Sequence, residues 1–147
     1  MLRELFSPGS VSLDLAGGTR DDVLLEMVSL LRIEERTTHA LHRMLKRRES
    51  LGSTGVGRGV AIPHARSLGV DRVRLAYGRH RAGIAYDALD ARPVHHLFLI
   101  VAPPVEISNQ YLPVLGRVAQ FVKEPEIIDR LDALTVPDDF FALLDHA

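Results

Sequence analysis

The sequence predicts an α/β protein in which a mixed β-sheet is sandwiched between helices, all in a single domain over residues 1–147. Three observations support this prediction. An alternating segment near the N-terminus is followed by two segments with apolar residues at helical spacing. Residues 96–102 form a continuous apolar run, and the last third of the chain returns to helical spacing. The chain is long enough to bury a core of its own, and it shows no internal repeat or linker.

The first half of the chain reads as a strand followed by two helices. Residues 10–15 alternate like a strand, with one face formed by Val11, Leu13 and Leu15. After Gly17 and Gly18, Thr19 precedes Asp22 by three residues, which is typical of a helix N-cap. The apolar stripe of this helix is Val23, Leu24, Met27, Leu30 and Leu31. A second helix is expected from about residue 38 to Arg48, with an inner face formed by Leu41, Met44 and Leu45.

The second half contains short strands and then helices. Residues 60–62 read as a strand that ends at Pro63, residues 73–81 as a half-exposed strand, and residues 96–102 as a central strand buried on both faces. Residues 83–88 are expected to be extended and residues 90–93 to turn. Three helices should follow. Their inner faces are predicted to be Leu112, Leu115, Val118, Ala119 and Val122; then Ile127, Ile128 and Leu131; and finally, after Pro137 or Asp138, Phe140, Phe141 and Leu144.

Composition excludes several classes of function. The chain contains no cysteine, so disulfides and thiolate metal sites are impossible. No apolar run approaches the roughly 18 residues of a membrane span, and the first ten residues are too short and too charged for a signal peptide. We therefore expect a cytoplasmic protein without direct membrane insertion.

Charge is distributed unevenly along the chain. Residues 43–81 contain ten arginine and lysine residues against two acidic residues, a net charge of +8, whereas the remainder carries −9. A basic zone of this kind attracts phosphate or an acidic partner surface, although a solvated surface explains many charge clusters equally well. Few aromatic residues accompany the arginines and no DNA-binding motif is present, so no specific nucleic acid is expected.

The most informative stretch is residues 48–66, RESLGSTGVGRGVAIPHAR. Four glycines within eight residues allow positive φ and close approach to a ligand, and successive backbone amides in such turns bind anions. The stretch contains neither a P-loop nor G-x-G-x-x-G, so nucleotide binding is not supported. We interpret His64 as a reactive residue, because a neutral imidazole is a competent phosphoryl acceptor. A purely structural histidine is the alternative.

The other histidines favour structural roles. His39 and His42 lie three residues apart on the second helix without a third ligand nearby, so no metal site is predicted. His95 and His96 are adjacent in a strand and must point to opposite faces, so both cannot serve one site, although one of them could approach His64. No cofactor is expected.

The stretch from Arg48 to His64 resembles the active-site signature of the fructose/mannitol-type enzyme IIA domains of the phosphoenolpyruvate-dependent sugar phosphotransferase system, including nitrogen-regulatory members. The matching residues are Arg48-Glu49, Leu51 to Gly57 and Gly59 to His64, and the resemblance extends over nearly the full chain. It implies that His64 is phosphorylated by a phosphohistidine carrier protein and that Arg48 lines the same site. The phosphate cradle would comprise the Thr54 hydroxyl and the backbone of Gly55, Val56, Gly57 and Gly59.

One position departs from the pattern. Many relatives carry a second active-site histidine at the start of the helix that contains Tyr111 here, and the alignment places it at Tyr111 itself. Tyrosine donates a hydrogen bond but is neutral at pH 7, so it supplies no imidazolium charge. Alternatively, Tyr111 only packs against the loop.

The resemblance leaves three functions open. The chain is either a phosphorylated regulator that acts on target proteins, which we favour slightly, or a sugar-specific IIA component that donates to a permease IIB domain. In the third reading it is an interaction module that has lost phosphorylation. As a phosphorylated regulator or as a sugar-specific IIA component, the chain would act as a phosphotransferase.

Overall fold

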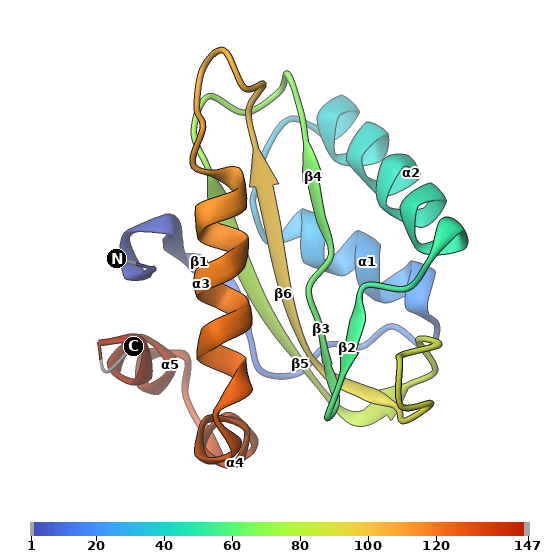
Figure 1. Cartoon of the computed structure of the whole chain (residues 1–147), viewed down its shortest axis with the longest axis vertical. Helices are drawn as coiled ribbons and strands as arrows, with labels where there is room; N and C mark the ends of the chain where they lie inside the picture. The colour runs from blue at the N-terminus through green and yellow to red at the C-terminus, as the bar shows by residue number, and fades with distance from the viewer. Residues whose placement is uncertain (1, 146–147) are drawn as a thin grey trace.

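The computed structural model describes residues 2–145, which form a mixed β-sheet with helices on both faces (Figure 1). The predicted fold class is confirmed. The strands are β1 (Phe6–Ser12), β2 (Gly55–Gly57), β3 (Val60–Ala61), β4 (His64–Arg66), β5 (Arg74–Ile84) and β6 (Val94–Ala102). A 3-10 turn (Arg3–Leu5) precedes β1, and the α-helices are α1 (Arg20–Ser29), α2 (Glu35–Leu51), α3 (Tyr111–Lys123), α4 (Pro125–Ala133) and α5 (Pro137–Leu144). Within this part of the chain, no helix combines the length and apolarity that a membrane crossing requires.

Strand β6 is the centre of the sheet. The strand order is β1-β5-β6-β3-β2, and β4 also pairs with β6. β5 runs antiparallel to β6, whereas β3 and β4 both run parallel to it. Residues 96–102 are buried on both faces, as predicted from their continuous apolar run.

Two apolar clusters cover the two faces of the sheet. α1 and α2 pack on one face, where Leu24, Met27 and Leu41 meet Leu97 and Leu99 of β6. α3, α4 and α5 cover the other face, where the rings of Tyr77 and Phe140 stack with centroids 4.4 Å apart. Because both faces are covered, β5 is buried between residues 75 and 79, and the prediction of a half-exposed strand was wrong.

Strand β1 lies earlier in the sequence than the predicted residues 10–15. It pairs in parallel with β5, with Phe6 opposite Leu75 and Val11 opposite Tyr77. Leu13 remains in the cluster that contains Val11, but Leu15 belongs to the cluster on the opposite face. The regular strand therefore ends at Ser12, although the Leu15 N–H still donates to the Arg79 carbonyl of β5 at 2.9 Å.

The helices confirm some of the predicted details and correct others. The Thr19 hydroxyl accepts a hydrogen bond from the backbone N–H of Asp22, which confirms the N-cap of α1. Helix α2 extends beyond the predicted range at both ends, and Met44 is 47% exposed instead of facing inward. Leu112 of α3 is 70% exposed, because the buried face of this helix is formed by Val114, Val118, Phe121 and Val122.

Pro63 separates β3 from β4 without ending the ladder along β6. Its carbonyl accepts a hydrogen bond from the Ile100 N–H at 3.0 Å, whereas its nitrogen has no hydrogen to donate. His64 opens β4 directly after this interruption and lies level with Ile100. The fold therefore places the histidine at the junction of two short strands, beside the carboxyl half of the central strand.

Candidate functional site

The imidazole of His64 is half-buried and has a defined orientation. Its Nδ1 lies 2.7 Å from the carbonyl oxygen of Ile62. Because a carbonyl can only accept, Nδ1 carries the hydrogen and donates it. The lone pair of the neutral ring is then on Nε2, and this is the nitrogen available to a partner.

Tyr111 and Arg66 lie beside His64. The rings of His64 and Tyr111 meet edge to face with centroids 5.8 Å apart, and the Arg66 guanidinium lies 4.5 Å from the centroid of the Tyr111 ring. His64 and Arg66 are two residues apart on β4, so their side chains leave the strand on the same face. The site thus combines residues from β4 and from the first turn of α3.

Tyr111 is a neutral phenol at physiological pH. Burial raises the pKa of the Tyr111 hydroxyl to about 12, although the nearby charges of Arg66 and Arg48 act to lower it. The hydroxyl therefore remains a hydrogen-bond donor across the physiological range.

Arg48 projects from the last turn of α2. Its side chain is exposed, and its Nη1 donates to the carbonyl oxygen of Gly52 at 2.6 Å. This contact holds one terminal nitrogen of the guanidinium group to the loop that follows the helix. An arginine carries five N–H donors, so further donors remain for an anion.

The glycine-rich segment folds mainly as a hairpin that leads away from His64 (Figure 1). Gly57 pairs with Val60, which lies level with His96, whereas His64 lies level with Ile100. Four residues of strand correspond to about 13 Å. The structure therefore does not bring Gly57 and Gly59 together with His64.

The hairpin itself explains two of the glycines. Gly57 and Gly59 have φ of 95° and 79°, values that the turn requires and that glycine adopts without strain. The carbonyl of Gly59 accepts from the backbone N–H groups of His95 and His96, and Val56 is 46% exposed. The phosphate-binding role of Gly55, Val56, Gly57 and Gly59 stays a prediction.

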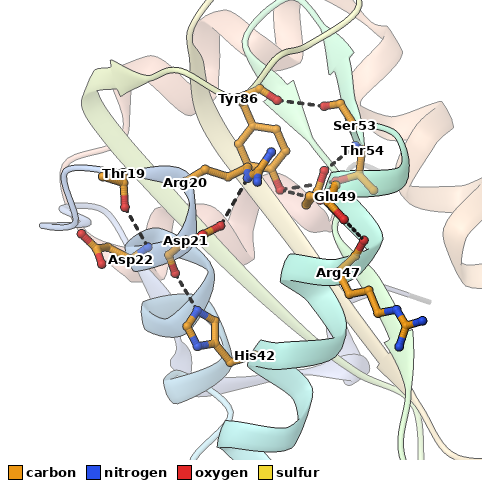
Figure 2. A network of polar contacts seen from close by, with 11 residues as sticks. Thr19, Arg20, Asp21, Asp22, His42, Arg47, Glu49, Ser53, Thr54 and Tyr86 are labelled. Carbon is orange, nitrogen blue, oxygen red and sulfur yellow. Dashed lines mark hydrogen bonds and ion pairs between the residues drawn. The ribbon is translucent and has the colours of Figure 1, made fainter.

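Thr54 lies nearer to His64 than the hairpin does, since its carbonyl accepts from the Ile62 N–H at 3.0 Å. Its hydroxyl, however, donates to the carboxylate of Glu49, which is only 4% exposed. Glu49 also accepts from the Thr54 N–H at 2.7 Å and from the Tyr86 hydroxyl at 2.9 Å (Figure 2). The Thr54 hydroxyl therefore already donates its hydrogen to Glu49, so this hydrogen is not available to a phosphoryl oxygen.

Several cations of the basic stretch have structural roles. Arg79 is 3% exposed and donates to the carbonyls of Leu13, Leu131 and Leu134, and Arg81 pairs with Asp14 at 2.7 Å. Arg58 donates to two carbonyls at the end of α3. Arg66, by contrast, contacts the Tyr111 ring that lies against His64. Arg66 was not singled out from the sequence, although its position two residues after His64 on a strand indicated a shared face.

The remaining histidines lie in separate environments. His42 binds the carbonyl of Asp21, His95 binds the carbonyl of His80, and His96 contacts Tyr77 and Asp132. In residues 2–145, no group of three or more His, Cys, Asp or Glu side chains could hold a metal ion.

The fold and the site together define a class of protein: an α/β domain that presents one free imidazole nitrogen beside a neutral phenol, against which an arginine stacks. A family model described as "Phosphoenolpyruvate-dependent sugar phosphotransferase system, EIIA 2" matches residues 4–147. The chain belongs to this family, which confirms the resemblance inferred from residues 48–64.

Individual relatives include both regulatory and sugar-specific proteins. The chain is 30% identical over 145 residues to a nitrogen regulatory protein of Pseudomonas aeruginosa, covering 97% of this chain and 94% of that protein. It is 32% identical over 134 residues to the PTS system fructose-specific EIIABC component of Bacillus subtilis, covering 88% of this chain but 21% of that protein. The chain thus spans about a fifth of the second relative.

Among solved structures, the nitrogen regulatory protein IIA-Ntr from Neisseria meningitidis superimposes with a TM-score of 0.87 at 30% sequence identity. The match covers 97% of this chain and 98% of that one. The arrangement of strands and helices is therefore shared over the full length of both chains.

Proposed function

We propose that this chain is a cytoplasmic phosphocarrier that accepts a phosphoryl group on Nε2 of His64 from a phosphohistidine carrier protein. The observation that supports this proposal best is the hydrogen bond from Nδ1 to the Ile62 carbonyl, which leaves the Nε2 lone pair free. Family membership supplies the reaction class, because the matching family description is that of the phosphotransferase system.

The reaction proceeds by in-line attack of Nε2 on the phosphorus of the carrier's phosphohistidine. The new nitrogen–phosphorus bond forms on His64 while the old bond breaks and its electron pair returns to the carrier's ring. The Ile62 carbonyl stabilises the Nδ1–H as the ring becomes positive. Arg48 holds phosphoryl oxygens with its free donors, because positioning and charge stabilisation provide most of the catalysis in phosphoryl transfer.

Phosphorylation would turn the site into a switch. It adds about −1.5 to −2 charges beside Arg48 and Arg66, which changes the surface that a partner meets. We favour a regulatory role in which this change selects target proteins. The support is a relative of similar length, the nitrogen regulatory protein of Pseudomonas aeruginosa.

A sugar-specific role is the second candidate. The fructose-specific EIIABC relative from Bacillus subtilis favours it, and in this role phospho-His64 would donate to a IIB domain. Transfer of labelled phosphate from the chain to a purified IIB domain distinguishes the two roles. A third possibility, an interaction module without phosphorylation, follows if Tyr111 cannot support transfer.

The test uses phosphoenolpyruvate, enzyme I and a carrier protein, followed by intact-protein mass spectrometry at neutral to alkaline pH. We expect one added phosphate on the unmodified chain and on a His39→Ala control, and none on His64→Ala. His39 suits the control because it is an exposed histidine on α2. No phosphate on the unmodified chain, with components that phosphorylate another IIA domain, would overturn the proposal.

A further inference from the structure

We propose that Arg66 and Tyr111 form the second half of the phosphoryl-binding site, opposite Arg48, with Arg66 supplying a permanent positive charge and Tyr111 a neutral hydrogen-bond donor. This inference rests on the proposed function of His64 and adds two residues to it. It follows from the way that the two side chains are fixed beside the histidine.

Arg66 is held in place before any ligand arrives. Its Nη1 donates to the Pro103 carbonyl at 2.7 Å and to the Ser108 carbonyl at 3.4 Å, both in the segment between β6 and α3. These contacts occupy one end of the guanidinium group, and the Tyr111 ring covers part of its face. A cation fixed in this way needs little rearrangement when a phosphoryl group arrives, and such preorganisation is what makes charge stabilisation effective.

Tyr111 is positioned by helix α3 and by its contact with Arg66. It is the first residue of α3, and its ring contacts both the guanidinium of Arg66 and the ring of His64. Within residues 2–145 the Tyr111 hydroxyl has no hydrogen-bond partner, so it is free to donate to a phosphoryl oxygen. Stacking on the arginine restricts the ring, which keeps the donor beside the imidazole.

The two arginines approach the histidine from different layers. Arg48 comes from α2, which packs with α1 on one face of the sheet. Arg66 contacts Tyr111 of α3, which packs on the other face. Arg66 and Tyr111 therefore lie on the α3 side of His64, away from the layer that carries Arg48.

The first experiment measures the rate of phosphorylation by phosphoramidate, a small donor that transfers its phosphoryl group and releases ammonia. A small donor removes effects on protein docking. The variants are Arg66→Gln, Tyr111→Phe and the double variant, with Arg72→Gln as the control that removes a nearby exposed positive charge. We expect each single variant to react about tenfold slower, and the control to stay within about twofold of the unmodified chain.

The double variant tests whether Arg66 and Tyr111 act together on the phosphoryl group or whether Arg66 only anchors the segment between β6 and α3. If Arg66 acts together with Tyr111, the double variant should be much less impaired than the product of the two single effects, because coupled residues are not additive. Strictly multiplicative effects, or an Arg66→Gln rate equal to that of the unmodified chain, would overturn the inference. Thermal unfolding of every variant confirms that it is folded.

A second experiment asks whether the lost charge can be replaced. In the Arg66→Gln background, Tyr111→His should restore the rate below about pH 6.5, where an imidazolium supplies the missing charge, and not above it. All rates are expressed relative to the unmodified chain at the same pH, which cancels the titration of the donor. Absence of this pH-dependent rescue would contradict the electrostatic role of Arg66. If the unmodified chain itself accepts no phosphate from either donor, the proposed function fails instead.

Discussion

Arg48 and Glu49 are adjacent in the last turn of α2, yet they face different surroundings. One helical residue corresponds to about 100° of rotation, so neighbouring side chains leave the helix in different directions. Arg48 is exposed and reaches the Gly52 carbonyl, whereas Glu49 is 4% exposed and accepts three hydrogen bonds. Arg48 is therefore available to a ligand, whereas Glu49 stabilises the end of the helix that carries Arg48.

Replacement of Arg48 by lysine tests the role of the guanidinium. Arg48→Lys keeps the charge but loses the planar set of donors that can bind Gly52 and a phosphoryl oxygen together. We expect phosphorylation to slow by roughly tenfold or more, with a change in the free energy of unfolding within about 0.5 kcal/mol because the residue is exposed. Normal transfer by this variant would remove Arg48 from the mechanism.

At the scale of single residues, the sequence allowed His64, Arg48 and Tyr111 to be predicted as neighbours. The structure places the Tyr111 ring against the His64 ring, whereas the role of Arg48 in the same site stays a prediction. The glycines were harder to interpret, because a glycine at positive φ serves a hairpin turn as well as a phosphate cradle. The competition between Glu49 and a ligand for the Thr54 hydroxyl could not be foreseen either. It depends on how α2 ends and on a tyrosine, Tyr86, that lies far away in the sequence.

At the scale of elements, the end of α2 is connected to the loop that leads into β2. The Glu49 carboxylate binds both the N–H and the hydroxyl of Thr54, while Tyr86 contributes its hydroxyl from the segment after β5 (Figure 2). Ser53 adds a hydrogen bond to the Tyr86 carbonyl at 2.9 Å. This network fixes the loop on the same turn of α2 that carries Arg48.

Glu49→Gln should therefore destabilise the protein. The amide keeps the shape of the side chain but places an NH₂ group against groups that donate, so at least one buried donor is left without an acceptor. We expect a loss of about 1–3 kcal/mol in the free energy of unfolding, measured by urea denaturation. The exposed Glu106→Gln serves as the control and should change it by less than about 0.5 kcal/mol. Equal stability of the two variants would show that the network contributes little.

The order of the longer strands and of the helices was predictable because their periodicities are clear, whereas the short strands β2 and β4 were not predicted. Packing determined which residues are buried. Residues 73–81 alternate in sequence like a half-exposed strand. In the structure Arg79 instead donates to carbonyls at the end of α4, so a charged residue is buried. Sequence periodicity could not reveal a partner that lies more than fifty residues away.

At the scale of the whole molecule, a chain of hydrogen bonds connects the sheet to the C-terminal helices; it is buried at Tyr77 and His96 and reaches the surface at Asp132. The Tyr77 hydroxyl of β5 donates to Nδ1 of His96 at 2.8 Å, and Nε2 of this β6 residue donates to the carboxylate of Asp132 in α4 at 2.7 Å. A neutral imidazole satisfies both contacts, since it has one donor and one acceptor nitrogen. Protonation would place a second N–H against the tyrosine hydroxyl.

Stability should fall in mildly acidic solution because of His96. Burial lowers the pKa of its imidazole below the ordinary value, although Asp132 acts to raise it. The unfolded chain therefore binds this proton more readily than the folded chain. The neutral His96 imidazole therefore stabilises the folded chain fully at pH values above its pKa in the unfolded chain, about 6.5. This stabilisation is lost as the pH falls from there towards the lower pKa of His96 in the folded chain.

Urea denaturation at several pH values between about 7.5 and 5 measures this effect. We expect the free energy of unfolding to decrease with falling pH in the unmodified chain and in an exposed-site control, His39→Gln. In His96→Gln, the free energy of unfolding should depend less on pH, whatever the absolute stability of this variant. An identical slope in all three proteins would exclude His96 as the titrating group.

The central claim is that Nε2 of His64 accepts the phosphoryl group while Nδ1 remains bound to the Ile62 carbonyl. The most direct test is the long-range ¹H–¹⁵N NMR spectrum of the labelled imidazole before and after phosphorylation by the carrier protein. We predict a protonated Nδ1 in the free chain and phosphorus coupling at Nε2 afterwards. Coupling at Nδ1, or phosphate on any residue other than His64, would contradict the account.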